Sequence, residues 1–189
     1  MMQQPKMVKV QKENEVNTYA HLWHASWVFM HIAETKIEGS YYQIMAGILF
    51  AALALEAFCN HVGKFLFPCW ESIEKKLGPQ EKLCLICEKL GIAKDDGKRP
   101  FQTVSELIKF RNSISHGKSV KLRKDFEVPR DGLESFLQKE LEAEWQAYIQ
   151  IENLKRVRED VEAIITSIHA RSKMEDIAFN LGISGYVAG

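Results

Sequence analysis

The sequence predicts an all-α fold: a helical bundle in which two long antiparallel helices come first, shorter helices follow, and a long C-terminal helix closes the domain. Apolar residues recur at steps of three and four over residues 16–36 and again over 140–173, which is the period of an amphipathic helix. Residues 44–55 (IMAGILFAALAL) form an almost continuous apolar run, which is typical of a buried core helix. No convincing strand pair or internal repeat is visible in the sequence.

The predicted helices begin and end at recognisable signals. Gly39 stops the first helix, Ser40 is a plausible N-cap of the second, and Pro68 ends the second. Thr103 followed by Glu106 is a capping-box signature that opens a helix ending near Ile114, before Gly117. The predicted helices span 16–36, 41–67, 70–77, 80–90, 103–114 and 131–141, followed by a long final helix with a break near Asn153. Residues 117–130 are a polar connection.

The chain of 189 residues therefore divides into a flexible N-terminal arm (1–15), one helical domain (16–172) and a C-terminal tail (173–189). Its 25 basic and 25 acidic residues give no formal net charge, so any binding of phosphate must come from a local patch. Four cysteines are too few for a disulfide scaffold, and no signal peptide is visible, which predicts a reducing, cytoplasmic location. The apolar run at 44–55 is about half the ~20 residues needed to cross a membrane, so no membrane span is expected.

Two charged residues occupy apolar surroundings. Glu56 lies within LFAALALEAFCNHV, although carboxylates are almost never fully buried unless they are paired. Arg111 follows Leu107 and Ile108 at steps of four and three, so it shares the apolar face of its helix. The sequence therefore suggests that Glu56 and Arg111 pair. Such a pair can be purely structural.

The stretch FRNSISHGK adds an amide and an imidazole beside this arginine. Asn112 and His116 are four residues apart and share one helix face, with Arg111 on the adjacent one. A histidine can move protons near neutral pH, and an arginine can stabilise charge that develops on phosphorus, so these residues suit phosphodiester chemistry without a metal. A histidine that only interacts with the dipole of its helix explains the same pattern. The basic residues Lys118, Lys121, Arg123 and Lys124 then form a patch suited to an RNA backbone.

The motif RNSISHG, an arginine and a polar residue followed by a histidine at the end of an amphipathic helix, resembles the signature of the HEPN superfamily. Glu56 and Asn60 in LEAFCNHV match the acidic and polar positions often found on its second helix, and the resemblance covers residues 15–172. It implies a HEPN-like α-helical bundle and, in many members, a ribonuclease that needs no metal or cofactor and acts as a toxin or defence effector. RNA is cleaved by attack of its 2′-hydroxyl, leaving a 2′,3′-cyclic phosphate.

Carried onto this chain, the resemblance makes His116 the general base or acid and Arg111 the group that stabilises the pentavalent phosphate. Asn112 positions the histidine or the substrate, and Glu56 orients Arg111. The resemblance also implies a homodimer whose two motifs face one cleft, and an antitoxin or a nucleotidyltransferase as a further partner. Members that lack catalysis imply the alternative, a helical module that binds nucleotide, RNA or protein.

Other patterns in the sequence favour structural roles. Cys84 and Cys87 have CxxC spacing, yet within a predicted amphipathic helix they are interpreted as small core residues. No second ligand pair at suitable spacing accompanies them, so no metal site is predicted. His21, His24 and His31 lie on one face of the first helix and are interpreted as a polar or interface stripe.

Overall fold

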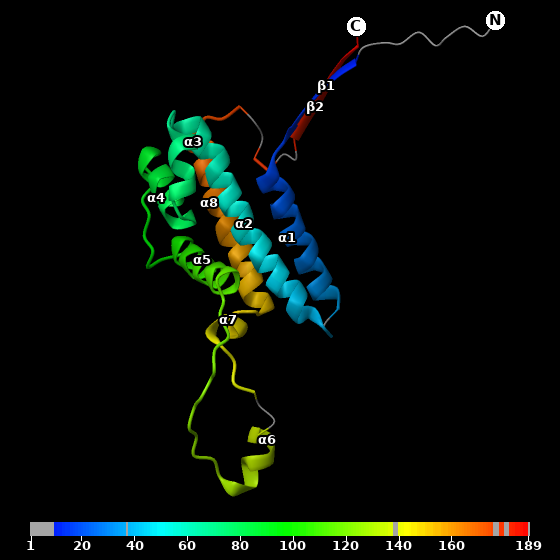
Figure 1. The fold of residues 1–189 in the computed structure, drawn as a ribbon, viewed down its shortest axis with the longest axis vertical. Helices are drawn as coiled ribbons and strands as arrows, with labels where there is room; N and C mark the ends of the chain where they lie inside the picture. Colours follow the sequence, from blue (N-terminus) through cyan, green and yellow to red (C-terminus); the bar gives the residue numbers. More distant parts are fainter. Residues whose placement is uncertain (1–9, 37, 138–139, 176–177, 180–181, 189) are drawn as a thin grey trace, which may run out of the picture.

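The computed structural model describes residues 10–36, 38–137, 140–175, 178–179 and 182–188. Three long helices form its body: α1 (Thr18–Thr35), α2 (Ser40–Leu66) and α8 (Ile151–Ser172). Figure 1 shows α1 and α2 running antiparallel side by side, with α8 beside them. The described chain is mostly helical, so the predicted fold class is confirmed at the level of an all-α bundle.

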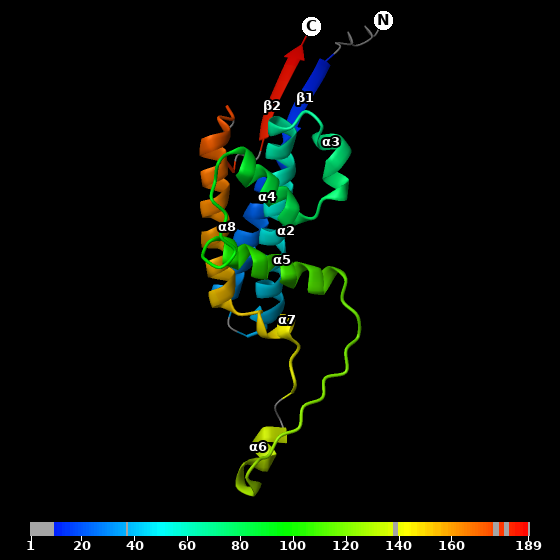
Figure 2. The same ribbon diagram turned by 90° about the vertical axis from the view of Figure 1, so that its left-hand side faces the viewer.

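Five shorter helices complete the described fold, and all but α6 lie against the bundle. They are α3 (Trp70–Ile73), α4 (Pro79–Lys89), α5 (Phe101–Ser115), α6 (Leu133–Leu137) and α7 (Glu144–Ala147), with 3₁₀ turns at Glu74–Lys76 and Arg130–Gly132. Figure 2 shows α5 crossing α2 and α8 near the middle of the bundle. The chain from residue 117 to 143 then leaves the bundle, carries α6 at its far end and returns through α7.

The core lies along α2 because this helix is apolar around most of its circumference. Phe58 and Val62 are fully buried, and α8 supplies a matching apolar face from Leu154 to Ile168. Two glycines let neighbours approach closely. A Cβ on Gly47 would lie 2.8 Å from the Leu154 side chain, and one on Gly63 would lie 2.2 Å from the ring of Trp70. Close packing of this kind fixes the position of α2.

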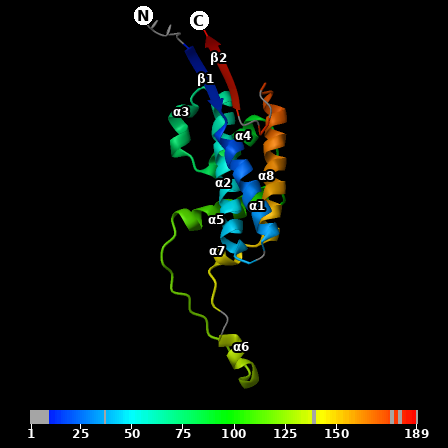
Figure 3. The same cartoon turned by 90° about the vertical axis from the view of Figure 1, so that its right-hand side faces the viewer.

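The two ends of the chain pair as strands, which the sequence did not predict. β1 (Val10–Val16) and β2 (Gly182–Ala188) form an antiparallel two-stranded sheet with Val10 opposite Ala188 (Figure 3). Residues 10–15 are therefore not a flexible arm, and part of the tail at 173–189 is a strand, while residues 1–9 lie outside the described residues. The polar sequence VQKENEV lacks the alternation of a half-buried strand, and its partner is at the opposite end of the chain.

Several helix boundaries also differ from the predicted ones. Thr103 is buried inside α5 rather than at its start, since the N-cap is Pro100 and the Glu106 side chain contacts α8 instead. The helix predicted at 131–141 is only α6 (Leu133–Leu137), preceded by a 3₁₀ turn. The break predicted near Asn153 lies at residues 148–150. Ser40 is the first residue of α2, after Gly39 in the left-handed conformation.

By length and composition, α2 is apolar enough to cross a membrane. Half of its most apolar stretch, however, is buried against the other helices, as in the core helix of a soluble protein. The length of the helix thus does not support the expectation that it is too short to cross a membrane, and only its partial burial favours a core helix.

Candidate functional site

Glu56 is the centre of an ion cluster where α2, α4 and α5 meet. Arg111 Nη2 of α5 donates to Glu56 Oε2 at 2.9 Å, which confirms the predicted pair. Lys82 Nζ of α4 donates to the other carboxylate oxygen, Glu56 Oε1, at 3.2 Å. The carboxylate thus bridges two cations and ties three helices together.

Lys82 was missed by the sequence analysis, although the sequence carries a signal for it. It lies four residues before Ile86 and one before Leu83, so it falls on the apolar face of α4, as Arg111 does on α5. The Lys82 side chain is only 6% exposed, which makes it the most buried charge of the cluster. A lysine buried this deeply needs a counter-charge, and Glu56 supplies it.

The charges of the cluster do not cancel. Lys82 and Arg111 contribute two positive charges and Glu56 contributes one negative charge, so one positive charge remains. The Arg111 side chain is 23% exposed, whereas Lys82 is covered. The excess positive charge is therefore accessible to solvent through the guanidinium of Arg111, where an anion such as a phosphate can approach it.

Asn112 contacts Arg111 rather than His116. Arg111 Nη1 donates to Asn112 Oδ1 at 3.0 Å, so the guanidinium is held from both sides, by an amide oxygen and by the Glu56 carboxylate. Two of its nitrogens are committed to neighbours whose positions are fixed by helices. The orientation of the guanidinium is thus set before any ligand arrives.

His116 is the C-cap residue of α5, and its backbone N–H donates to Asn112 O at 3.0 Å. Its side chain is exposed and makes no hydrogen bond or ion pair with the described residues. Five helical positions separate Arg111 from His116, which places them about 140° apart around the axis of α5. The structure therefore brings Glu56, Arg111 and Asn112 together, and it leaves the imidazole free at the end of the same helix.

The four basic residues of the predicted RNA-binding patch follow directly after this histidine. Lys118, Lys121, Arg123 and Lys124 are all exposed in an irregular segment, residues 117–129. The segment extends away from the bundle (Figure 1). Lys124 Nζ lies 5.3 Å from the centre of the Phe126 ring, and that ring packs on Phe136 near α6. The patch therefore begins at the end of α5 and continues outward from it.

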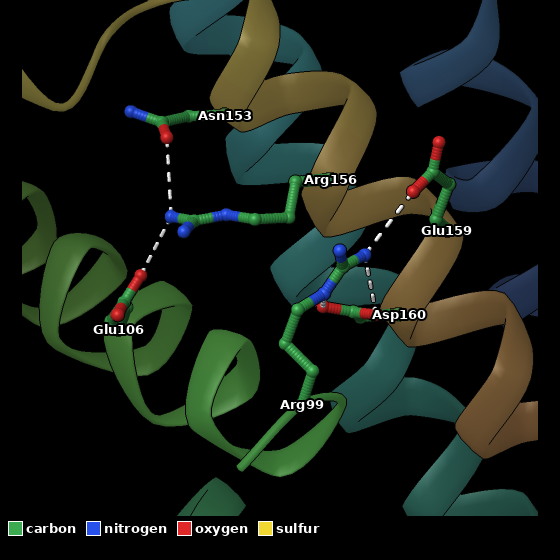
Figure 4. Close-up of polar contacts among 6 residues, drawn as sticks. All are labelled: Arg99, Glu106, Asn153, Arg156, Glu159 and Asp160. Carbon is green, nitrogen blue, oxygen red and sulfur yellow. Dashed lines mark hydrogen bonds and ion pairs between the residues drawn. The ribbon is translucent and has the colours of Figure 1, made fainter. Parts of the chain in front are cut away.

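A cavity of about 410 Å³ opens on another face of α5. α5, α7 and the start of α8 line it, with Glu106, Lys109, Phe110, Ser113, Glu144, Trp145, Ala147, Tyr148, Asn153 and Arg156. Arg156 Nη2 donates to Glu106 Oε2 at 2.7 Å and to Asn153 Oδ1 at 3.1 Å (Figure 4). Neither Arg111 nor His116 lines this cavity. No local sequence pattern predicts this cavity, because its residues come from three separate segments.

A second ion network, one turn further along α8, fixes the start of α5. Arg99 donates to both carboxylate oxygens of Asp160, at 2.8 and 2.9 Å, and its Nη2 also lies 3.2 Å from Glu159 (Figure 4). The two carboxylates raise the pKa of Arg99 further above its usual value, Asp160 being the larger influence. α5 is therefore anchored to α8 at two points, the residue before its start and Glu106 near its middle.

The structure confirms the interpretation of Cys87 as a core residue but not that of Cys84. Cys59 and Cys87 are buried, whereas Cys84 and Cys69 are exposed, so the interpretation of Cys84 as a core residue was wrong. Burial raises the pKa of Cys59 to about 12 and that of Cys87 to about 11.

Within the described ranges, no three His, Cys, Asp or Glu side chains are grouped closely enough to hold a metal ion.

Two of the three histidines of α1, His24 and His31, form an exposed stack with Trp27. The ring of Trp27 lies 5.6 Å from that of His24 and 5.5 Å from that of His31, and Trp27 is 45% exposed. His21 is exposed as well, so all three lie on the surface, and whether they form a polar or an interface stripe stays a prediction. Helical spacing of three and four residues is sufficient to produce the stack.

Comparison with known proteins adds no relative to this picture. No protein-family model matches the chain, and no curated protein or solved structure is significantly similar to it.

Proposed function

We propose that this chain is a metal-independent endoribonuclease that cleaves RNA by attack of the 2′-hydroxyl on the adjacent phosphorus. The observation that carries the proposal is the guanidinium of Arg111, which Glu56 and Asn112 fix on the same helix end that presents the exposed His116. A fixed cation that stabilises charge on the phosphoryl oxygens and an imidazole that accepts a proton are two of the groups that this reaction needs from a protein.

In this mechanism His116 accepts the proton of the 2′-hydroxyl. The 2′-oxygen then forms a bond to phosphorus, the bond from phosphorus to the 5′-oxygen breaks, and a 2′,3′-cyclic phosphate and a 5′-hydroxyl remain. Arg111 stabilises the negative charge that builds up on the phosphoryl oxygens. Glu56 does not neutralise Arg111 completely, because the same carboxylate also pairs with Lys82. The leaving 5′-oxygen takes a proton from a general acid.

A homodimer supplies that acid. Each chain contributes one His116 to this site. In a dimer the two copies of His116 meet at the scissile bond, where one imidazole accepts a proton and the other donates one. The exposed basic residues of segment 117–129 hold the RNA backbone beside it. We further propose that the enzyme acts in the cytoplasm as a toxin or defence effector, restrained by an antitoxin or acting beside a nucleotidyltransferase.

The experiment that tests the proposal compares wild-type protein with His116→Ala on a labelled RNA in the presence of EDTA. Because general acid–base catalysis contributes about 10²- to 10⁴-fold, cleavage by the variant should fall by at least about 100-fold. The exposed position predicts a change in the free energy of unfolding within about 0.5 kcal/mol. His24→Ala, at another exposed histidine, is the matched control and should retain full activity.

Equal cleavage by wild type and His116→Ala, or loss of cleavage on removing metal, contradicts the mechanism. Product ends give a second readout, since the mechanism requires a 2′,3′-cyclic phosphate on the upstream fragment. Growth arrest on expression, relieved by His116→Ala, is the expected result for a toxin.

One observation favours a second function, a module that binds RNA or nucleotide without cleaving it. No described residue bonds to the imidazole of His116, whereas catalytic histidines are oriented by a partner on their second nitrogen. In that case Arg111 and the basic segment bind phosphate, and both wild type and His116→Ala bind RNA equally and leave it intact.

A further inference from the structure

We propose that the cavity between α5, α7 and the start of α8 binds a nucleobase, and that it is the base-recognition subsite beside His116. This inference rests on the proposed function, because the bound base is assigned to the RNA whose phosphate lies at the end of α5. It assigns a role to residues that the cleavage mechanism does not use.

The walls of the cavity are aromatic. Phe110, Trp145 and Tyr148 line it, and the rings of Phe110 and Tyr148 lie 5.3 Å apart at an angle of 37°. Unstacked bases of single-stranded RNA bind to proteins mainly by stacking on such side chains, and every base has a flat face that can do so. The volume of about 410 Å³ lies within the range of small-molecule sites.

The cavity also holds buried hydrogen-bonding groups, among them the phenol of Tyr148 beside the guanidinium of Arg156. Arg156 makes its hydrogen bonds to Glu106 and Asn153 through Nη2 alone. Its Nε and Tyr148 Oη are buried and make no hydrogen bond of normal geometry. Burial raises the pKa of Tyr148, so the phenol keeps its proton and can donate it in a hydrogen bond at neutral pH. Directed donors of this kind recognise the polar edge of a base.

The charges of the lining residues balance. Lys109 and Arg156 are matched by Glu106 and Glu144, so the cavity has no excess of either sign. Zero net charge gives a phosphate no electrostatic attraction to the cavity. An uncharged, planar and polar group can bind there through stacking and hydrogen bonds. The balance therefore assigns the base to the cavity and leaves the phosphate to the basic segment that follows His116.

The cavity lies on the side of α5 that leads to His116. Lys109 and Ser113 line it from α5, and His116 is three positions beyond Ser113 on the neighbouring helix face. Three residues advance about 4.5 Å along a helix, which is less than the length of one nucleotide. A nucleotide with its base in the cavity therefore directs its ribose and phosphate toward the imidazole.

Calorimetric titration of the full-length His116→Ala protein tests the inference, because this variant cannot consume its ligand. The probes are the four ribonucleoside monophosphates and a short single-stranded RNA. Stacking contributes enough affinity that Trp145→Ala, added to His116→Ala, should raise the Kd by about 10-fold or more. Trp27→Ala, which removes an exposed tryptophan of α1, is the matched control and should leave the Kd unchanged. Trp145→Leu keeps apolar volume on α7 and repeats the test if Trp145→Ala fails to fold.

Weaker binding of both probes, in the Trp145 variants but not in Trp27→Ala, supports the inference. Unchanged binding of both probes overturns it, even if wild type cleaves RNA through His116. Weaker binding of the monophosphates alone shows a site for free nucleotide and overturns the assignment to RNA. If binding depends on Trp145 while wild type leaves all RNA intact, the base site stands and the proposed ribonuclease fails.

Discussion

Replacing Glu56 by glutamine removes the anion from a cluster that holds two cations, and the protein should lose stability. Lys82 is 6% exposed and Arg111 is 23% exposed, so neither charge can be fully hydrated where it stands. Breaking a fully buried pair costs about 3–5 kcal/mol. Glu56 is itself 21% exposed, which lowers the expected loss for Glu56→Gln to about 2–3 kcal/mol.

Urea unfolding, followed by circular dichroism at 222 nm, measures this loss. With an m-value of about 2 kcal/mol per molar urea, the midpoint should fall by roughly 1–1.5 M. The exposed pair of Lys64 and Glu71 offers a matched control, since both side chains are more than two-thirds exposed. Glu71→Gln should change the free energy of unfolding by less than about 0.5 kcal/mol.

A double variant tests the electrostatic reasoning directly. Adding Lys82→Met to Glu56→Gln removes the cation that has no access to water, so the double variant should regain at least about 1 kcal/mol. If Glu56→Gln is as stable as wild type, the cluster does not tie the helices together. If the double variant is no more stable than Glu56→Gln, the loss comes from packing and not from unmatched charge.

Two further predictions concern thiols and packing. At pH 8 a thiol reagent should label Cys69 and Cys84 quickly and Cys59 only after unfolding, because the pKa of Cys59 is raised to about 12; rapid labelling of more than two thiols in the native protein would contradict this. The pKa of Cys59 in the folded protein lies above the usual value of 9, so its contribution to stability is present below pH 9 and should decline as the pH rises toward 12. Urea midpoints measured at several pH values for wild type and Cys59→Ala check this decline. Gly63→Ala should cost about 1–3 kcal/mol in urea unfolding, since its new methyl group would overlap the buried ring of Trp70, and an unchanged midpoint would show that the ring can move aside.

The long helices were predictable because a three- and four-residue apolar period leaves little choice of fold. The pairing of Glu56 with Arg111 followed from the same reasoning, since each charge interrupts an apolar face. Lys82 carried that signal too, but an isolated lysine on a short amphipathic helix is also explained by a side chain that reaches solvent. Its burial depends on how α4 meets α2, which no local pattern specifies.

Other features could not be predicted because they depend on residues far apart in the chain. The cavity beside α5 exists because α7 and α8 return to it after the excursion of residues 117–143. Thr103 and Glu106 fit a capping box in sequence, yet Glu106 contacts Arg156 of α8 and the helix begins earlier. A tertiary ion pair here takes the place of a local hydrogen bond to the backbone.

The antiparallel ribbon of β1 and β2 sets an order on the assembly of this protein. The whole helical domain lies between its two strands in the sequence. If the strands paired before the helices formed, they would close a very long loop, at a high cost in chain entropy. Once α1 and α8 have packed on α2, both strands lie beyond the same end of the bundle (Figure 1), and the remaining entropy of closure is smaller. The ribbon therefore forms after the helices and depends on them, while the helices do not depend on the ribbon.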